Sequence, residues 1–141
     1  MTILFSIIAL PLGNNFTSAG ASTRGGCDIV IMLPPELKDA SGNFLSSAHI
    51  DQPVFITIIF ANCTDEEIPF IVVIEARDED DVTVYLQFQA GKLDANANSE
   101  ISLAWSPEKS GKHELRTFAL SDLTQPQIYS QIWVSEVTIS K

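Results

Sequence analysis

Apolar residues are concentrated in stretches of about five to eleven residues, separated by clusters of Pro, Gly, Asn and Asp. Such runs, apolar throughout or alternating with polar residues, are typical of β-strands. No useful length of chain has the helical period, and residues 34–39 offer at most one helical turn. The predicted strands are residues 27–33, 53–62, 69–77, 82–89, 99–105, 112–120 and 128–139. This pattern predicts an all-β fold, an antiparallel β-sandwich of about seven strands.

The strands differ in how their apolar residues are arranged. Residues 54–60 and 70–74 are almost uniformly apolar, which indicates central strands covered on both faces. Residues 82–89 alternate instead, which indicates a half-exposed strand. If the more apolar set in this strand faces the core, Val84 and Leu86 point inward and Tyr85 points outward.

The first 21 residues have the features of an export signal. Residues 3–12 form an apolar run, Ala19-Gly20-Ala21 follows, and no charged side chain precedes Arg24. The run is too short to span a bilayer, and a small-x-small tripeptide suits signal peptidase. We therefore expect a signal peptide at residues 1–21 and one domain at residues 22–141. No Lys or Arg precedes the apolar run, so the alternative is that the run is a structural strand.

Charge narrows the range of partners. The chain has 18 acidic and 8 basic residues, a formal net charge of −10. An acidic surface repels nucleic acid and anionic lipid head groups, whereas cations and basic proteins remain candidate partners. A plainer explanation of the net negative charge is that it keeps an exported protein soluble. The chain ends directly after the last predicted strand, so we predict no transmembrane anchor there.

Two cysteines, Cys27 and Cys63, predict a disulfide in an exported chain. Cys27 opens the first predicted strand and Cys63 follows the second. Antiparallel pairing of these strands brings the two residues side by side. With so few soft ligands elsewhere, a zinc or copper site is not expected.

A motif near the C-terminus carries a family resemblance. Trp105-Ser106-Pro107 precedes Gly111-Lys112-His113-Glu114-Leu115-Arg116-Thr117-Phe118, and a further Pro precedes the last strand. The motif resembles the start of the penultimate strand of immunoglobulin-like and fibronectin-III-like sandwiches, with His113 in place of the usual Tyr and Leu115 at the core position. Residues 105–137 are also similar to exported domains of uncharacterised proteins from ammonia-oxidising archaea. The resemblance implies an exported or envelope-associated β-domain and brings no catalytic residue with it.

The residues do not assemble a catalytic constellation. Nucleophilic catalysis needs a Ser, Cys or Thr beside a base, usually His. His113 is expected at the corner just described, and His49 in a loop before the second strand. The phosphate-binding, Gly-x-Ser-x-Gly and His-Glu-x-x-His motifs are missing from the sequence. We therefore expect that the protein is not an enzyme and needs no cofactor.

Acidic clusters offer a subordinate calcium hypothesis. In an antiparallel sandwich, the turns after the second, fourth and sixth strands lie at the same end. Hard oxygen ligands gathered there form a weak candidate site for calcium. The candidate ligands are Asp65, Glu66, Glu67, Asp94 and Asp122. The run Asp78–Asp81 lacks the spacing of a calcium loop, so we expect a solvated tight turn there.

Asn62-Cys63-Thr64 matches the Asn-x-Ser/Thr rule for N-glycosylation at the end of a predicted strand. Asn62 is therefore a candidate glycan acceptor. A disulfide at Cys63 would hinder the modification.

Aromatic residues predict a binding surface. If His113, Leu115 and Thr117 point inward, their neighbours in the strand point outward. An outward patch of aromatic residues with one Arg has the composition of interface hot spots. The predicted patch consists of Tyr85, Arg116, Phe118 and Trp133. The alternative is that a loop covers the patch or that a bulge turns Trp133 inward.

These features predict a non-catalytic, exported binding or assembly module at the cell envelope, acting through one sheet face on an envelope or extracellular protein or on itself. The first alternative is a structural surface-layer or fibre component, in which edge strands at residues 27–33 and 128–139 pair with neighbouring copies. The second alternative is a calcium-dependent or carbohydrate-binding module. In each case the expected location is extracellular or envelope-associated.

Overall fold

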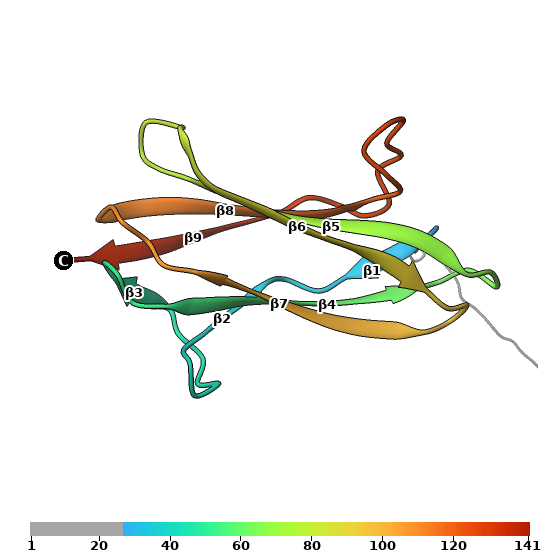
Figure 1. The fold of residues 1–141 in the computed structure, drawn as a ribbon, viewed down its shortest axis with the longest axis horizontal. Helices are drawn as coiled ribbons and strands as arrows, with labels where there is room; N and C mark the ends of the chain where they lie inside the picture. The colour runs from blue at the N-terminus through green and yellow to red at the C-terminus, as the bar shows by residue number, and fades with distance from the viewer. Residues whose placement is uncertain (1–26) are drawn as a thin grey trace, which may run out of the picture.

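The computed structural model describes residues 27–141, which form nine strands and no helix. The strands pack as two layers (Figure 1). They are β1 (Val30–Met32), β2 (Glu36–Lys38), β3 (Ser47–His49), β4 (Val54–Asn62), β5 (Ile68–Arg77), β6 (Thr83–Leu93), β7 (Asn98–Trp105), β8 (Gly111–Leu120) and β9 (Trp133–Ser140). The predicted all-β sandwich is confirmed.

The two sheets differ in the strands that form their edges. In the four-stranded sheet, β4 lies between β7 on one side and the short strands β1 and β2 on the other. The five-stranded sheet has the order β3-β9-β8-β5-β6. The predicted central strands, β4 and β5, are therefore central, and β6 is an edge strand.

Two short strands were not predicted from the sequence. Pro34 and Pro35 have no N–H groups to donate, so pairing along β4 is interrupted and resumes at β2. The expected helical turn at residues 34–39 is wrong, because Glu36–Lys38 pairs with β4 instead. The chain then crosses to the other sheet, where β3 runs parallel to β9 at residues 138–140. The predicted edge at residues 128–139 is thus covered at its C-terminal end.

The core lies between the layers and is built by alternation in the two central strands. Val54, Ile56, Ile58 and Phe60 point inward from β4. Phe70, Val72, Ile74 and Ala76 point inward from β5. The rings of Phe60 and Phe70 meet edge to face across the sandwich, with their centroids 4.8 Å apart.

The predicted signal peptide at residues 1–21 lies outside the described residues, as does the start of the predicted domain at residue 22. Residues 27–141 contain no helix that is long and apolar enough to cross a membrane.

Candidate functional site

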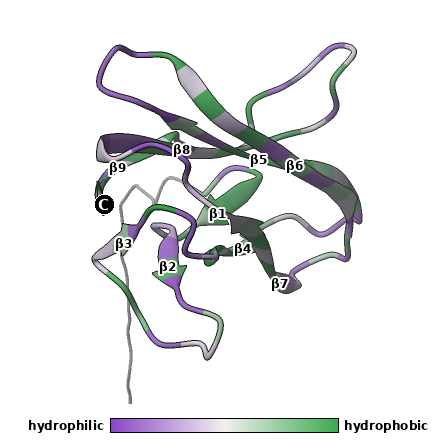
Figure 2. Cartoon of the chain, turned by 60° about the vertical axis from the view of Figure 1, so that its left-hand side comes forward, coloured by the Kyte–Doolittle hydropathy of each residue, from purple (hydrophilic) through white to green (hydrophobic). Residues whose placement is uncertain are grey.

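The outward surface of the five-stranded sheet is unusually apolar. Val84, Leu86 and Phe88 of β6 are 40%, 58% and 52% exposed, and Val134 of β9 is 51% exposed. Hydrophobic and hydrophilic bands follow one another along β6 (Figure 2). We define the outer face as these four residues together with Arg116 and Phe118 of β8, which point the same way. Exposed apolar side chains gathered on one sheet face are typical of contact surfaces.

Strand register brings these side chains together. Phe88 pairs with Val73 of β5, and Val73 pairs with Phe118 of β8. In the next row, Leu86 pairs with Glu75, which pairs with Arg116, which pairs with Val134. The two rows make a continuous strip across four strands of the sheet.

Each charged side chain in this strip is paired with a neighbouring side chain of opposite charge. Arg116 Nε lies 3.1 Å from a Glu114 carboxylate oxygen. Glu75 accepts hydrogen bonds from Thr83 Oγ1 at 2.5 Å and from Arg77 Nε at 2.9 Å. These bonds, the one from Thr83 first, lower the pKa of Glu75 below its ordinary value. The outer face is therefore electrically balanced on an acidic chain.

Tyr85 does not belong to the predicted patch. Its ring packs at 5.7 Å from that of Trp105, and its hydroxyl donates a hydrogen bond to the Ala104 carbonyl at 2.8 Å. Partial burial raises the pKa of this phenol above its ordinary value. Alternation in β6 is therefore opposite to the prediction: Val84, Leu86 and Phe88 point outward. Leu93 is buried and lies an even number of residues from Tyr85, so the two side chains are on the same side of β6. The position of Leu93 at the end of the strand is the feature of the sequence that indicates this orientation.

Trp133 also points inward. Its indole N–H donates to the Met32 carbonyl at 2.8 Å, and its ring packs against the core. Val134 takes the outward position instead. The predicted orientation of the last strand is wrong. Trp133 lies an even number of residues from Val137 and Ile139, so it is on the same side of β9 as these two buried residues.

The predicted inward residues of β8 are confirmed. His113, Leu115 and Thr117 are buried. His113 Nδ1 lies 3.1 Å from the Gly111 carbonyl oxygen, and its ring meets that of Trp105 edge to face. His113 therefore fills the corner that Tyr occupies in the resembled domains. Phe118 and Arg116 keep the outward orientation predicted for them.

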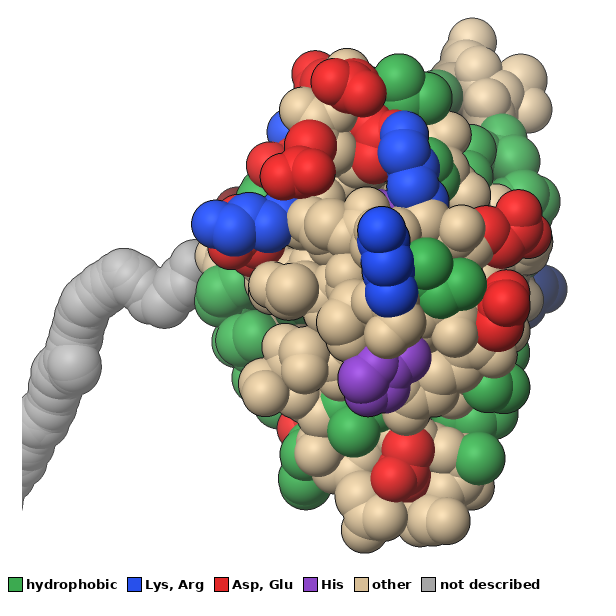
Figure 3. Space-filling view, turned by 90° about the vertical axis from the view of Figure 1, so that its left-hand side faces the viewer, with side chains coloured by type: hydrophobic (Ala, Val, Ile, Leu, Met, Phe, Trp, Pro, Cys, Tyr) green, Lys and Arg blue, Asp and Glu red, His purple; other side chains and the backbone are tan. Residues whose placement is uncertain are grey.

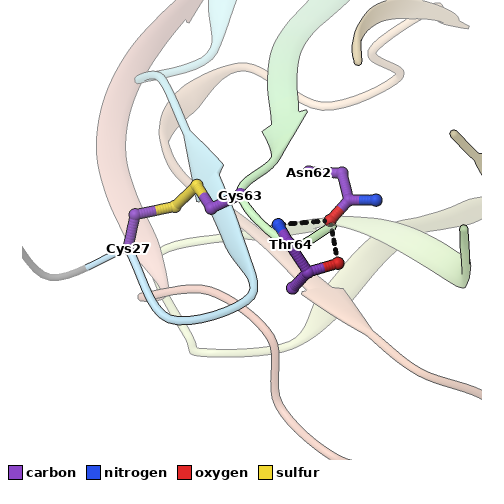
Figure 4. Close-up of a disulfide and its surroundings, with 4 residues drawn as sticks. All are labelled: Cys27, Asn62, Cys63 and Thr64. Carbon is purple, nitrogen blue, oxygen red and sulfur yellow. Dashed lines mark hydrogen bonds between the residues drawn. A yellow bond between two sulfur atoms is a disulfide. The ribbon is translucent and has the colours of Figure 1, made fainter. Parts of the chain in front are cut away.

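Asn62 has a structural role at the end of β4. Its side-chain nitrogen donates to the carbonyls of Glu66, Leu93 and Asp94 at 2.7, 3.2 and 3.0 Å. Its side-chain oxygen accepts from the backbone N–H and the hydroxyl of Thr64 (Figure 4). The residue is only 2% exposed. A glycan on this nitrogen is incompatible with the folded domain, so the glycosylation hypothesis is wrong for this state.

The predicted disulfide between Cys27 and Cys63 is present, with the two Cα atoms 6.2 Å apart (Figure 4). It joins the start of β1 to the end of β4, since Val30 pairs with Asn62. The backbone N–H of Cys63 also donates to the Ile29 carbonyl at 2.8 Å.

The calcium candidates have other contacts. Asp65 accepts a hydrogen bond from Asn96, Glu67 lies 3.9 Å from Lys92, and Asp122 accepts the backbone N–H groups of Thr124 and Gln125. Within residues 27–141, no group of three or more His, Cys, Asp or Glu residues is arranged to hold a metal ion, so Asp65, Glu66, Glu67, Asp94 and Asp122 are not gathered into one.

The acidic turn between β5 and β6 is built around Asp78, not around an ion. One oxygen of its buried carboxylate accepts the N–H groups of Asp80 and Val82, and the other lies 2.6 Å from Lys109 Nζ. Acidic and basic side chains lie interspersed at the end of the molecule that carries the C-terminus (Figure 3). The bond from Lys109, followed by those from Val82 and Asp80, lowers the pKa of Asp78 below its ordinary value.

We expect this carboxylate to contribute to acid sensitivity. Because the folded-state pKa lies below the unfolded one, the stabilisation is complete above the ordinary Asp pKa, near 4, and is lost as pH falls through the folded-state value. Asp78→Asn keeps an oxygen for the two N–H groups but loses the ion pair. Urea unfolding at a series of pH values should show a flatter acid limb for the variant than for the wild type. Identical slopes would contradict this role.

Two hollows flank the core. A groove of about 670 Å³ runs between β1 and residues 127–131, with Met32, Tyr129 and Trp133 among its lining. A second hollow of about 530 Å³ lies beside Tyr85, Trp105 and His113. His49, in β3, lies outside both linings, and its Nδ1 is 2.7 Å from Ser140 Oγ.

The fold defines this protein as an immunoglobulin-like β-sandwich domain, and solved structures support that class. The C-terminal domain of Wzt is similar, with a TM-score of 0.66 and 9% identity over 79% of this chain and 74% of that one. So is the CARDB domain of a Pyrococcus furiosus protein, solved in complex with di-metal ions, with a TM-score of 0.55 and 9% identity over 79% of this chain and 91% of that one.

A β-glucosidase from Listeria innocua also matches, with a TM-score of 0.54 and 13% identity over 76% of this chain. The match spans only 16% of the enzyme's length. These likenesses show the fold alone. No protein-family model matches the chain, and no curated protein sequence matches it.

Proposed function

We propose that this protein is a non-catalytic binding or assembly module that contacts another protein through the outer face. The observation that carries the proposal is the strip of exposed Leu86, Phe88 and Val134, continuous with Phe118. A partner that covered this strip would remove several large apolar side chains from water, at about 25 cal/mol for each Å² buried. The balanced charges beside it supply directional contacts.

We further propose that the module acts outside the cell or at the cell envelope. The disulfide is compatible with an oxidising compartment. The resemblance of residues 105–137 to exported archaeal domains supports the same location, as does the predicted signal at residues 1–21. N-terminal sequencing of the protein from its native cells tests this part, with a start near Ser22 expected.

The absence of an enzymatic role is also a proposal. The imidazole of His113 is buried between Trp105 and the Gly111 carbonyl, where it supports the fold. His49 is exposed in β3, at the margin of the five-stranded sheet, and its only side-chain hydrogen-bond partner among residues 27–141 is the Ser140 hydroxyl. Neither arrangement combines a nucleophile, a base and an orienting group.

Site-specific photo-cross-linking in native cells tests binding through the outer face. A photoreactive phenylalanine analogue replaces Phe88, and a matched control carries it at Phe44, which is 70% exposed but lies in the loop between β2 and β3. We expect one recurrent protein neighbour at position 88 and none shared with position 44. Leu86→Ser combined with Val134→Ser should reduce that cross-link at least ~10-fold with little change in melting temperature, since both side chains are exposed.

Equal cross-linking at both positions, or a yield unaffected by the double substitution, would contradict the proposal. A fall in the melting temperature of the double variant would show that Leu86 and Val134 stabilise the folded domain rather than bind a partner.

A further inference from the structure

Strand β6 is an edge strand, and within residues 27–141 no segment pairs with its free side. It is 11 residues long and hydrogen-bonds to β5 along one side only. Within the described chain, the backbone of residues 83–92 has no hydrogen-bond partner outside β5. Every residue from Thr83 to Lys92 except Tyr85 is exposed. As far as residues 27–141 are concerned, an extended strand approaching this edge meets N–H and C=O groups that are free to pair.

The composition of β6 is also unusual for an edge. Natural edge strands are commonly protected by charged side chains on the edge, by Pro or by an inward-pointing charged residue. Residues 83–91 contain no charged residue and no Pro, although the chain as a whole has a net charge of −10. The one irregularity in the β5–β6 register lies at Ala76 and Arg77, at the start of the hairpin. Most of β6 is therefore neutral and regular.

We propose that the first partner of the outer face is a second copy of this chain, paired antiparallel along β6 about a two-fold axis at Leu86. The inference rests on the proposed function, because β6 supplies half of the outer face. Pairing of this kind joins two five-stranded sheets into one continuous sheet. It also brings the apolar stripes of the two copies together on the same side.

The two-fold axis fixes which residues meet. Leu86 lies opposite Leu86 of the second copy, and Val84 lies opposite Phe88. Aromatic residues paired with β-branched residues across antiparallel strands are among the favourable combinations. All these side chains point outward, so the pairing leaves Tyr85 in its contact with Ala104.

Charges at the two ends of β6 complement each other in this register. Lys92 of one copy extends past the start of the other copy's β6, toward the acidic turn that contains Asp80 and Asp81. The Lys92 side chain is 72% exposed and has only a long contact, 3.9 Å, to Glu67. The two-fold axis produces this contact twice. A second copy is therefore favoured over an unrelated acidic strand.

Sedimentation velocity of the purified protein tests the pairing. We expect a monomer–dimer equilibrium for the wild type. Leu86→Lys places two like charges opposite each other at the axis and should weaken dimerisation by about 100-fold. The matched control, Leu123→Lys, adds the same charge at a leucine that is equally exposed, 59% against 58%, but lies in the loop between β8 and β9, outside the outer face, and should dimerise as the wild type does.

A charge-swap experiment separates pairing from folding defects. Leu86→Glu alone should also be monomeric, whereas an equimolar mixture of Leu86→Lys and Leu86→Glu should recover the dimer. Recovery requires residue 86 of one copy to face residue 86 of the other. A wild type that stays monomeric at high concentration, or a Leu86→Lys variant that dimerises normally, would overturn the inference.

The two proposals fail in different ways. If the protein is monomeric but position 88 cross-links one different protein in cells, the second copy is wrong and the binding module stands. If the protein is monomeric and position 88 cross-links no recurrent neighbour, both are wrong. Cross-links between copies at position 88, together with the charge-swap recovery, support both.

Discussion

Replacing Asn62 by Asp should lower the free energy of unfolding by about 3 kcal/mol or more. The side-chain nitrogen of Asn62 donates to three carbonyl oxygens contributed by Glu66, Leu93 and Asp94. A carboxylate has no proton to donate and would face those oxygens while buried. This amide ties the end of β4 to the following turn and to the β6–β7 turn, so its loss loosens three segments together. Urea unfolding at neutral pH measures the effect.

Asn98→Asp is the matched control for this substitution. Asn98 begins β7 and is exposed, so the same change of chemistry and charge should alter stability by no more than about 0.5 kcal/mol. Equal losses in the two variants would mean that added negative charge, rather than the buried amide, sets the stability. A loss for Asn62→Ala close to that for Asn62→Asp would identify the missing donor as the cause.

Breaking the disulfide should cost about 4 kcal/mol of stability. Cys27 and Cys63 are 36 residues apart, and closing a loop of this length restricts the unfolded chain by roughly that amount in the chain-entropy model. The folded state depends on the bond as well, because β1 has only three residues with which to pair with β4. Unfolding with and without reductant, followed by alkylation of the thiols, gives the difference.

The doubly substituted Cys27→Ser, Cys63→Ser protein is the control, since reductant should leave its unfolding midpoint unchanged. We also expect faster hydrogen exchange at the amides of β1 in this variant, because β1 is no longer held covalently. An unfolding midpoint that is the same in the wild type with and without reductant would show that the bond adds nothing. Asn62 and Cys63 are adjacent, so combined losses should not be additive.

Local pattern was sufficient for much of the fold. Uniform apolar runs predicted β4 and β5 as central strands, because a strand covered on both faces has no polar side to show. The Gly111–Phe118 motif predicted which residues of β8 enter the core, and His113, Leu115 and Thr117 do so. The positions of Cys27 and Cys63 predicted the disulfide, because antiparallel neighbours bring the start of one strand to the end of the other.

The candidate site was predicted only in part, for a physical reason. Alternation along a strand separates two faces but does not say which face meets the other sheet. In β6 the more apolar set, Val84, Leu86 and Phe88, points outward, and Tyr85 points inward toward Trp105. In β9 the indole N–H of Trp133 reaches the Met32 carbonyl, a residue far away in sequence. Only Arg116 and Phe118 of the predicted patch lie on the outer face.

The fold class, the central strands, the disulfide and the acidic character of the chain follow from the sequence alone, because each depends on local composition or on spacing along the chain. The remaining features depend on contacts between segments that are distant in the sequence. The three-residue strands β2 and β3 exist because β4 and β9 offer partners, not because of their own residues. In the sequence Asn62 belongs to a glycosylation motif, whereas in the fold its buried side chain links three backbone carbonyls by hydrogen bonds. These carbonyls come from segments that lie together only in the folded sandwich.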